Sequence, residues 1–131
     1  KQGLIDEPEN GRYAFYLAQS YKDLGDFANA IPYYQKRANM GGWPEECYYA
    51  FYMVGYCKMK NKQSFWEFMP DLLRAYWIRP ERLEALNLLV RYCRLSKMHK
   101  LGFQYGMMAI NNVYPIKDLL FIDKYVHQVQ N

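Results

Sequence analysis

The sequence predicts an all-α fold of stacked helical hairpins, on three observations. Leu17 has counterparts in Val54, 37 residues later, and in Leu89, 35 residues after that. A period in the mid-thirties is typical of repeated helix pairs. Glycines and prolines break the chain into apolar segments of helical length. Of the 131 residues, 51% are hydrophobic, which is enough to build a core.

The breaks predict seven helices, over residues 10–24, 27–40, 45–60, 64–78, 81–96, 98–112 and 117–130. Gly25–Asp26 forms a turn, and Asp26 is placed to cap the following helix. Gly41–Gly42 ends the first hairpin, because Gly adopts the left-handed conformation that follows many helices. Ser64–Glu67 has the pattern of a capping box at the start of a helix.

Four prolines bear on the helix boundaries. Pro44 and Pro80 are expected at helix starts, where a missing N–H costs nothing, and acidic residues such as Glu81 follow them at the positive end of the helix dipole. Pro32 and Pro70 occupy equivalent places inside two expected helices. We interpret them as bends or late helix starts rather than as loops.

The same breaks predict the repeat boundaries. Residues 10–41, 42–80 and 81–113 are expected to form three hairpins, and residues 114–131 a C-terminal capping helix. Residues 1–9 are interpreted as the tail of a preceding repeat, because Pro8 closes them as Pro80 closes the second hairpin. The sequence begins at Lys1 rather than at Met, so we expect a piece of a longer protein.

The first hairpin resembles the tetratricopeptide repeat at its packing positions, which are Leu17, Ala18, Tyr21, Gly25, Phe27, Ala30 and Tyr34. The second hairpin keeps Gly55, Phe65, Ala75 and Pro80, and the third keeps Leu86, Leu89 and Ala109 but has Gly102 and Gly106. The resemblance covers about residues 3–112 and implies a right-handed solenoid that binds partners. Six equivalent packing positions are expected to be buried: Leu17, Tyr21, Tyr34, Val54, Leu89 and Ala109.

A narrower resemblance lies in residues 6–21, 41–46 and 114–123. These look like the helical repeats that follow the catalytic domain in some family 2 glycosyltransferases, where a separate Rossmann-like domain with an acidic metal motif binds the nucleotide sugar. No Asp-x-Asp occurs in this chain. The resemblance therefore implies a non-catalytic scaffold or recognition module in a larger glycosyltransferase-like protein, and leaves open whether that protein is an enzyme.

No catalytic, cofactor or metal site is expected within the chain. His99 and His127 lie far apart in sequence, and no Gly-rich phosphate-binding loop occurs. Cys47, Cys57 and Cys93 form no C-x-x-C pair and are expected to be reduced, buried thiols of a cytoplasmic protein. No run of 18 apolar residues occurs, so no membrane span is expected.

The candidate partner-binding groove is the wall formed by the first helix of each hairpin. Its candidate residues are Arg12, Tyr16, Gln19, Tyr49, Tyr52, Tyr56, Asn87, Arg91 and Arg94. Tyr offers a rigid apolar face with a hydroxyl, and Arg91 and Arg94 share a helix face that suits a carboxylate or phosphate. The alternative is that the Tyr rings pack against neighbouring helices as core.

The charge distribution leaves further alternatives open. Residues 58–104 carry ten Lys and Arg against four Asp and Glu. An RNA-contacting repeat is therefore the third hypothesis, after a module of a larger protein and a free-standing peptide-binding adaptor. The expected partner is a protein, a peptide or another domain of the same protein. If a preceding repeat is missing, Phe15 or Tyr16 should lie on an exposed apolar patch through which the N-terminal end self-associates.

Overall fold

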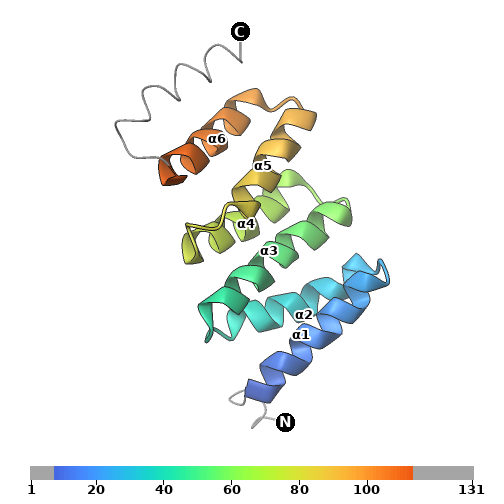
Figure 1. The fold of residues 1–131 in the computed structure, drawn as a ribbon. Coiled ribbons are helices and arrows are strands. Elements are labelled where there is room, and N and C mark those ends of the chain that lie inside the picture. The colour runs from blue at the N-terminus through green and yellow to red at the C-terminus, as the bar shows by residue number, and fades with distance from the viewer. Residues whose placement is uncertain (1–7, 114–131) are drawn as a thin grey trace. The chain divides into compact units, whose positions relative to one another are not determined.

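The computed structural model describes residues 8–113, and these residues form six α-helices and no strand. The helices are α1 (Pro8–Asp23), α2 (Phe27–Asn39), α3 (Pro44–Lys60), α4 (Phe65–Ile78), α5 (Glu84–Leu95) and α6 (His99–Val113) (Figure 1). The described part of the chain is therefore all-α, as predicted. Most of the expected N-terminal tail and the whole of the expected last helix lie outside the described residues.

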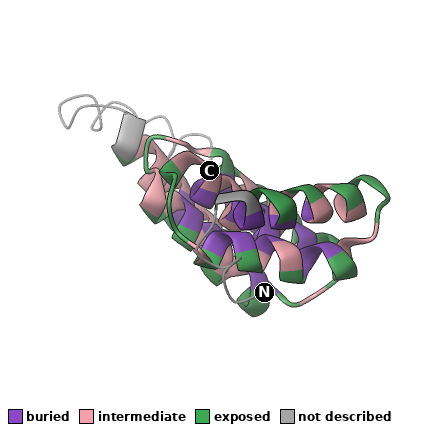
Figure 2. Ribbon diagram, turned by 90° about the horizontal axis from the view of Figure 1, so that it is seen from below, coloured by how far each residue is buried: buried purple, intermediate pink, exposed green. Residues whose placement is uncertain are grey.

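The chain divides into two compact units, Lys1–Arg79 and Pro80–Asn131. In the first unit α1 packs against α2, α2 against α3, and α3 against α4, while in the second α5 packs against α6. The buried residues of the helices lie on the sides that face their packing partners (Figure 2). The helices α1 and α2, α3 and α4, and α5 and α6 are thus packed pairs of consecutive helices.

The six expected packing positions fall into two groups. Tyr34, Val54 and Leu89 are 0% exposed, as predicted. Leu17, Tyr21 and Ala109 are only half-buried, and none of the six is exposed. Leu17 and Tyr21 belong to α1, whose main packing partner among the described helices is α2, so one side of this helix stays open to solvent.

The turn inside each hairpin closes with the same pair of backbone hydrogen bonds. After α1, the N–H of Gly25 donates to the carbonyl of Lys22 at 2.9 Å, and the next N–H donates to the carbonyl of Tyr21 at 2.9 Å. The pattern recurs at Lys62 after α3 and at Lys97 after α5. These three turn residues have φ values of 80°, 67° and 61°. The pattern is a Schellman motif, in which the left-handed conformation costs a Lys about 1 kcal/mol more than a Gly.

Other predicted boundaries are also present. The Asp26 carboxylate accepts from the N–H of Asn29 at 3.3 Å and so caps α2. Gly41 and Gly42 have positive φ after α2, and Pro44 is the first residue of α3. Local chemistry therefore defines the ends of the helices in the first unit.

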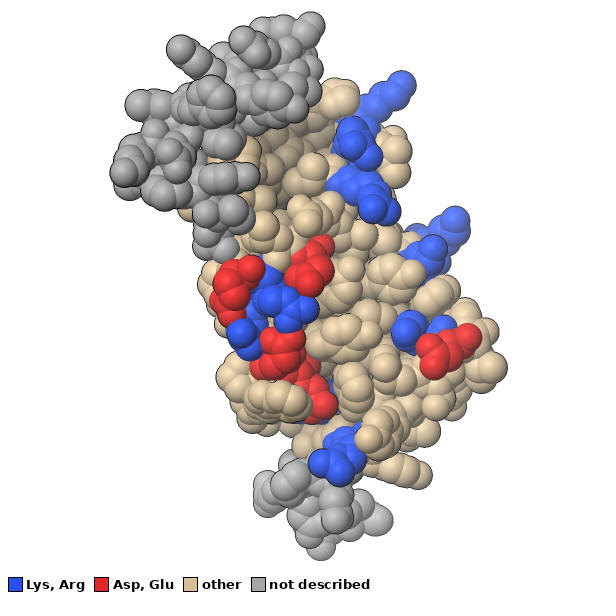
Figure 3. All heavy atoms as spheres, viewed as in Figure 1, with Lys and Arg blue, Asp and Glu red and all other residues tan. Residues whose placement is uncertain are grey.

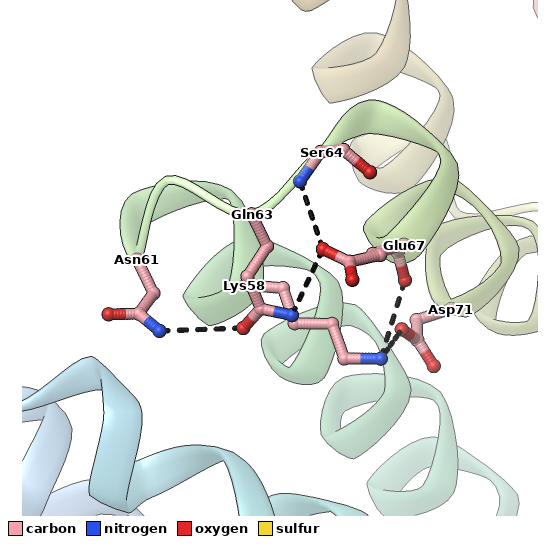
Figure 4. A network of polar contacts seen from close by, with 6 residues as sticks. All are labelled: Lys58, Asn61, Gln63, Ser64, Glu67 and Asp71. Atoms are coloured by element: carbon pink, nitrogen blue, oxygen red, sulfur yellow. Dashed lines mark hydrogen bonds and ion pairs between the residues drawn. The ribbon is translucent and has the colours of Figure 1, made fainter.

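The turn between α3 and α4 is held by a polar network (Figure 4). Lys58 Nζ pairs with Asp71 Oδ2 at 2.9 Å and donates to the backbone carbonyl of Glu67 at 3.3 Å. The Glu67 side chain accepts from the N–H of Ser64 at 3.0 Å, as the predicted capping box requires, and from Gln63 Nε2 at 3.5 Å. The end of α3 is thereby tied to the first two turns of α4.

The predicted start of α5 is wrong by three residues. Pro80 and Glu81 lie in the turn before the helix, and Glu84 is the acidic residue of its first turn. The residue that precedes the helix is Leu83, which has no side-chain acceptor for the free N–H groups. A Pro–Glu pair is equally compatible with a turn and with a first helical turn, so the sequence could not decide between them.

Arg37 joins the first hairpin to the second and is only 5% exposed. Its Nε pairs with Glu46 Oε1 at 2.7 Å, and its Nη1 donates to the carbonyl of Gly41 at 2.9 Å. The neighbouring Glu45 pairs with Arg79 from the end of α4 at 2.8 Å. Acidic and basic side chains lie in contact on the face shown in Figure 3, beside a broad area of uncharged surface. The acidic start of α3 therefore neutralises cations from two other helix ends.

Pro32 and Pro70 lie inside continuous helices, at the sixth residue of α2 and of α4, so neither lies in a loop, as predicted, and neither marks a late helix start. Both are exposed. A proline has no N–H for the carbonyl four residues earlier, which is that of Ala28 in α2 and that of Trp66 in α4. Ala28 and Trp66 are exposed too, so water can reach this side of each helix.

Replacing Pro32 with Ala is expected to raise the free energy of unfolding by about 1–3 kcal/mol. The change restores a hydrogen bond to the Ala28 carbonyl, and this gain exceeds the advantage that Pro has in stiffening the unfolded chain. Urea denaturation measures the difference. Pro44→Ala is the control, because Pro44 is the first residue of α3 and its N–H would have no helical partner. A gain at Pro44 as large as at Pro32 would contradict this explanation.

Candidate functional site

Four partly exposed aromatic side chains of α1 and α3 form what we call the aromatic wall: Phe15, Tyr49, Tyr52 and Tyr56. The ring centroids of Phe15 and Tyr49 are 5.7 Å apart in an edge-to-face arrangement, and those of Tyr49 and Tyr52 are 6.5 Å apart. Helical spacing places Tyr49, Tyr52 and Tyr56 along one side of α3. Phe15 extends this surface from α1.

The wall packs on the core and also stays partly exposed. All four rings lie against a buried cluster that includes Tyr34, Met53 and Val54. All four are nevertheless intermediate in exposure. The rings therefore pack on the core, as one interpretation of the Tyr stripe expects, and keep part of their surface accessible, while partner contact stays a prediction. A ring that already packs on the core on one side loses little conformational entropy when a ligand covers its other side.

Gln19 is held at the edge of the wall by a buried hydroxyl. The Tyr34 O–H donates to Gln19 Oε1, and Tyr34 itself is fully buried. Burial is the largest cause that raises the pKa of Tyr34 far above its ordinary value, so the hydroxyl keeps its proton and remains a donor. The amide oxygen of the half-exposed Gln19 is thereby engaged, and its NH₂ group is left to donate outward.

Arg12 and Tyr16 lie at the solvent-exposed border of α1. Tyr16 is 59% exposed, and its ring centroid lies 6.5 Å from that of Phe15. Arg12 is exposed as well. The expectation that Phe15 or Tyr16 is exposed is thus confirmed for Tyr16, whereas Phe15 is half-buried.

The remaining candidate residues, Asn87, Arg91 and Arg94, are exposed on α5. They belong to the second unit, whereas the aromatic wall belongs to the first. The alternative interpretation has Arg91 and Arg94 contact Glu81, Glu84 or solvent. Both arginines are exposed to solvent, and Glu84 pairs with Arg82 at 3.0 Å. A single ligand that spans both groups stays a prediction.

Sequence reasoning missed the exposed tryptophans of α4. Trp66 and Trp77 are 63% and 67% exposed. With Pro32 and Pro70 as equivalent positions, the counterparts of these tryptophans in α2 are Ala28 and Asn39. The repeat therefore does not require a large ring at either tryptophan position. A comparison of the first hairpin with the second could have identified these two tryptophans as unusual from the sequence.

The described residues offer little for metal or thiol chemistry. Within residues 8–113, no group of three His, Cys, Asp or Glu side chains could hold a metal ion. His99 is exposed, and His127 lies outside the described residues. Cys57 is 0% exposed, and burial raises its pKa to about 11, so it is a neutral thiol near pH 7. No helix in this part of the chain has the length and apolar character needed to cross a bilayer.

Comparisons with known proteins add no relative to this picture. No protein-family model matches the chain, and no curated protein does either. The tetratricopeptide and glycosyltransferase resemblances therefore rest on the residues quoted for them.

Proposed function

We propose that this chain is a non-catalytic recognition module whose aromatic wall binds an extended segment of a protein partner. The observation that carries the proposal is the pairing of a fixed inner side and an exposed outer side in the four wall rings. Aromatic side chains of this kind supply much of the binding energy at protein interfaces. The Gln19 amide adds a donor for a backbone carbonyl of an extended peptide.

The architecture we propose is a tetratricopeptide-like, right-handed solenoid of three hairpins. It is supported by the equivalent turns at Gly25, Lys62 and Lys97 and by the equivalent burial of Val54 and Leu89. Stacked hairpins of this type bind partners on the surface lined by their first helices. The larger glycosyltransferase-like context rests on the resemblance of short sequence segments alone.

The proposal is tested with linear peptides of about a dozen residues, selected from a displayed random library on the wild-type chain. Tyr52→Ala is expected to weaken the selected peptides at least about tenfold, because it removes a ring from the wall. Affinity is measured by fluorescence anisotropy, and circular dichroism confirms that the variant stays folded. Tyr49→Ala, on the same surface, is expected to act in the same direction.

Trp66→Ala is the matched control, because it removes an exposed ring of α4 outside the wall. It should leave peptide affinity unchanged. If the selection yields no peptide, or if binding depends on Trp66 and not on Tyr52, the proposed site is wrong.

A further inference from the structure

The side of α1 that faces away from its hairpin partner is unusually apolar for an exposed surface. We call it the outer face of α1, and it consists of Tyr13, Leu17, Ser20 and Leu24. Tyr13 is 66% exposed and Leu24 is 81% exposed, while Ser20 is exposed and Leu17 half-buried. The spacing of four, three and four residues places all four along one side of the helix and its end.

The equivalent positions in the second hairpin indicate that this face is a helix-packing surface. The counterparts of Tyr13, Leu17 and Ser20, 37 residues later on α3, are Ala50, Val54 and Cys57. All three counterparts are 0% exposed. Val54 and Cys57 share a buried cluster with residues of α2, which packs against α3. The outer face of α1 is therefore a helix-packing surface that no described helix covers.

Charged side chains at the two ends of α1 indicate which helix can pack on its outer face. Arg12 and Asp23 lie eleven residues apart, which is about three turns, so they flank the outer face on the same side at opposite ends. When two copies of α1 pack antiparallel, Arg12 of each copy approaches Asp23 of the other. The Asp23 side chain is 69% exposed and pairs with its neighbour Lys22 at 3.3 Å, and this weak surface pair is easily replaced.

We propose that two copies of this chain associate through the outer faces of their α1 helices, packed antiparallel about a two-fold axis. Such an interface is isologous, so each favourable contact occurs twice. Tyr13 and Leu24 supply the apolar area, and Ser20 allows the helix backbones to approach closely. The Arg12–Asp23 contacts set the antiparallel orientation.

Sedimentation equilibrium of the intact chain tests the proposal. At tens of micromolar, the wild-type chain is expected to have twice its mass of 15.8 kDa. Arg12→Asp alone and Asp23→Arg alone should each raise the dissociation constant at least about tenfold, because each places like charges together at two symmetric sites. The double variant Arg12→Asp with Asp23→Arg should restore dimerisation, since the charges match again.

Two further variants complete the test. Tyr13→Lys should leave the chain monomeric and folded, because this exposed residue has no structural role within the unit. Trp66→Lys changes an equally exposed ring on α4 and should leave the dimer intact. A wild-type chain that stays monomeric overturns the proposal, and so does a dimer that Trp66→Lys abolishes or that the double charge exchange fails to restore. None of these changes touches Tyr49, Tyr52 or Tyr56.

Discussion

Replacing Gly55 with Ala is expected to lower the free energy of unfolding by about 1–3 kcal/mol, although Ala is the better helix former. A Cβ at this position would lie 2.6 Å from Cγ of Leu72, 2.7 Å from its Cδ2 and 3.3 Å from the carbonyl oxygen of Phe68. Leu72 and Phe68 are both 0% exposed and have no room to withdraw. The pair α3 and α4 would have to move apart. Urea denaturation of the two proteins measures the loss.

Gly106→Ala is the matched control, because no described neighbour lies within 4 Å of a Cβ built on this glycine of α6. It should be neutral or stabilise the chain by up to about 1 kcal/mol. Leu72→Ala alone should cost about 2–5 kcal/mol, and the double variant with Gly55→Ala should cost less than the sum of the two. Additive effects at these two positions would show that the close contact between them does not limit stability.

Arg37→Met is expected to lower the free energy of unfolding by about 1–3 kcal/mol, because the Arg37 side chain is buried while the Glu46 carboxylate it leaves behind is 27% exposed and remains accessible to water. The change leaves the Glu46 carboxylate and the Gly41 carbonyl without the cation that satisfies both. Arg37→Lys should recover only part of the loss, because an ammonium group lacks the planar fork that reaches two acceptors at once. Thermal and urea unfolding of both variants provide the measurement.

Arg82→Ala is the comparison for an exposed ion pair. Its partner Glu84 lies 3.0 Å away, and the two side chains are 34% and 50% exposed. The expected cost is about 0–1 kcal/mol. If the two arginines cost the same, burial of Arg37 is not the source of its effect.

The helix boundaries that could be predicted from sequence are those marked by a capping residue or by a glycine that ends a helix. Gly25–Asp26, Gly41–Gly42 and Ser64–Glu67 each combine a left-handed residue or a cap with the end of an apolar segment, and the helices of the first unit end where predicted. The start of α5 was missed because Pro80 does not distinguish a turn from a first helical turn. Periodicity indicated which residues pack, but not how completely, so half-buried Leu17 was expected to be buried.

The sequence identified the Tyr stripe of α3 by its spacing but could not predict the exposure of its rings. A Tyr stripe at helical spacing is compatible with a core and with a binding surface, and only the tertiary packing of α3 shows that the rings are half-buried. Arg37 was missed altogether, because a cation in the last turn of a helix is expected to face solvent. Its burial follows from the acidic start of the next helix, which is a contact between elements rather than a local pattern.

The three cysteines have a practical consequence. Cys47 and Cys57 lie on α3 and Cys93 lies on α5, and all three are buried free thiols. Burial also raises the pKa of Cys57 and Cys93, so neither sulfur is ionised in the closed state near neutral pH. A thiol-labelling reagent can then react only with molecules in which the surrounding helices have transiently separated. The chain thus carries a thiol in each compact unit that reports local opening. The rate at which these thiols are labelled compares how often the two units open, without an engineered cysteine.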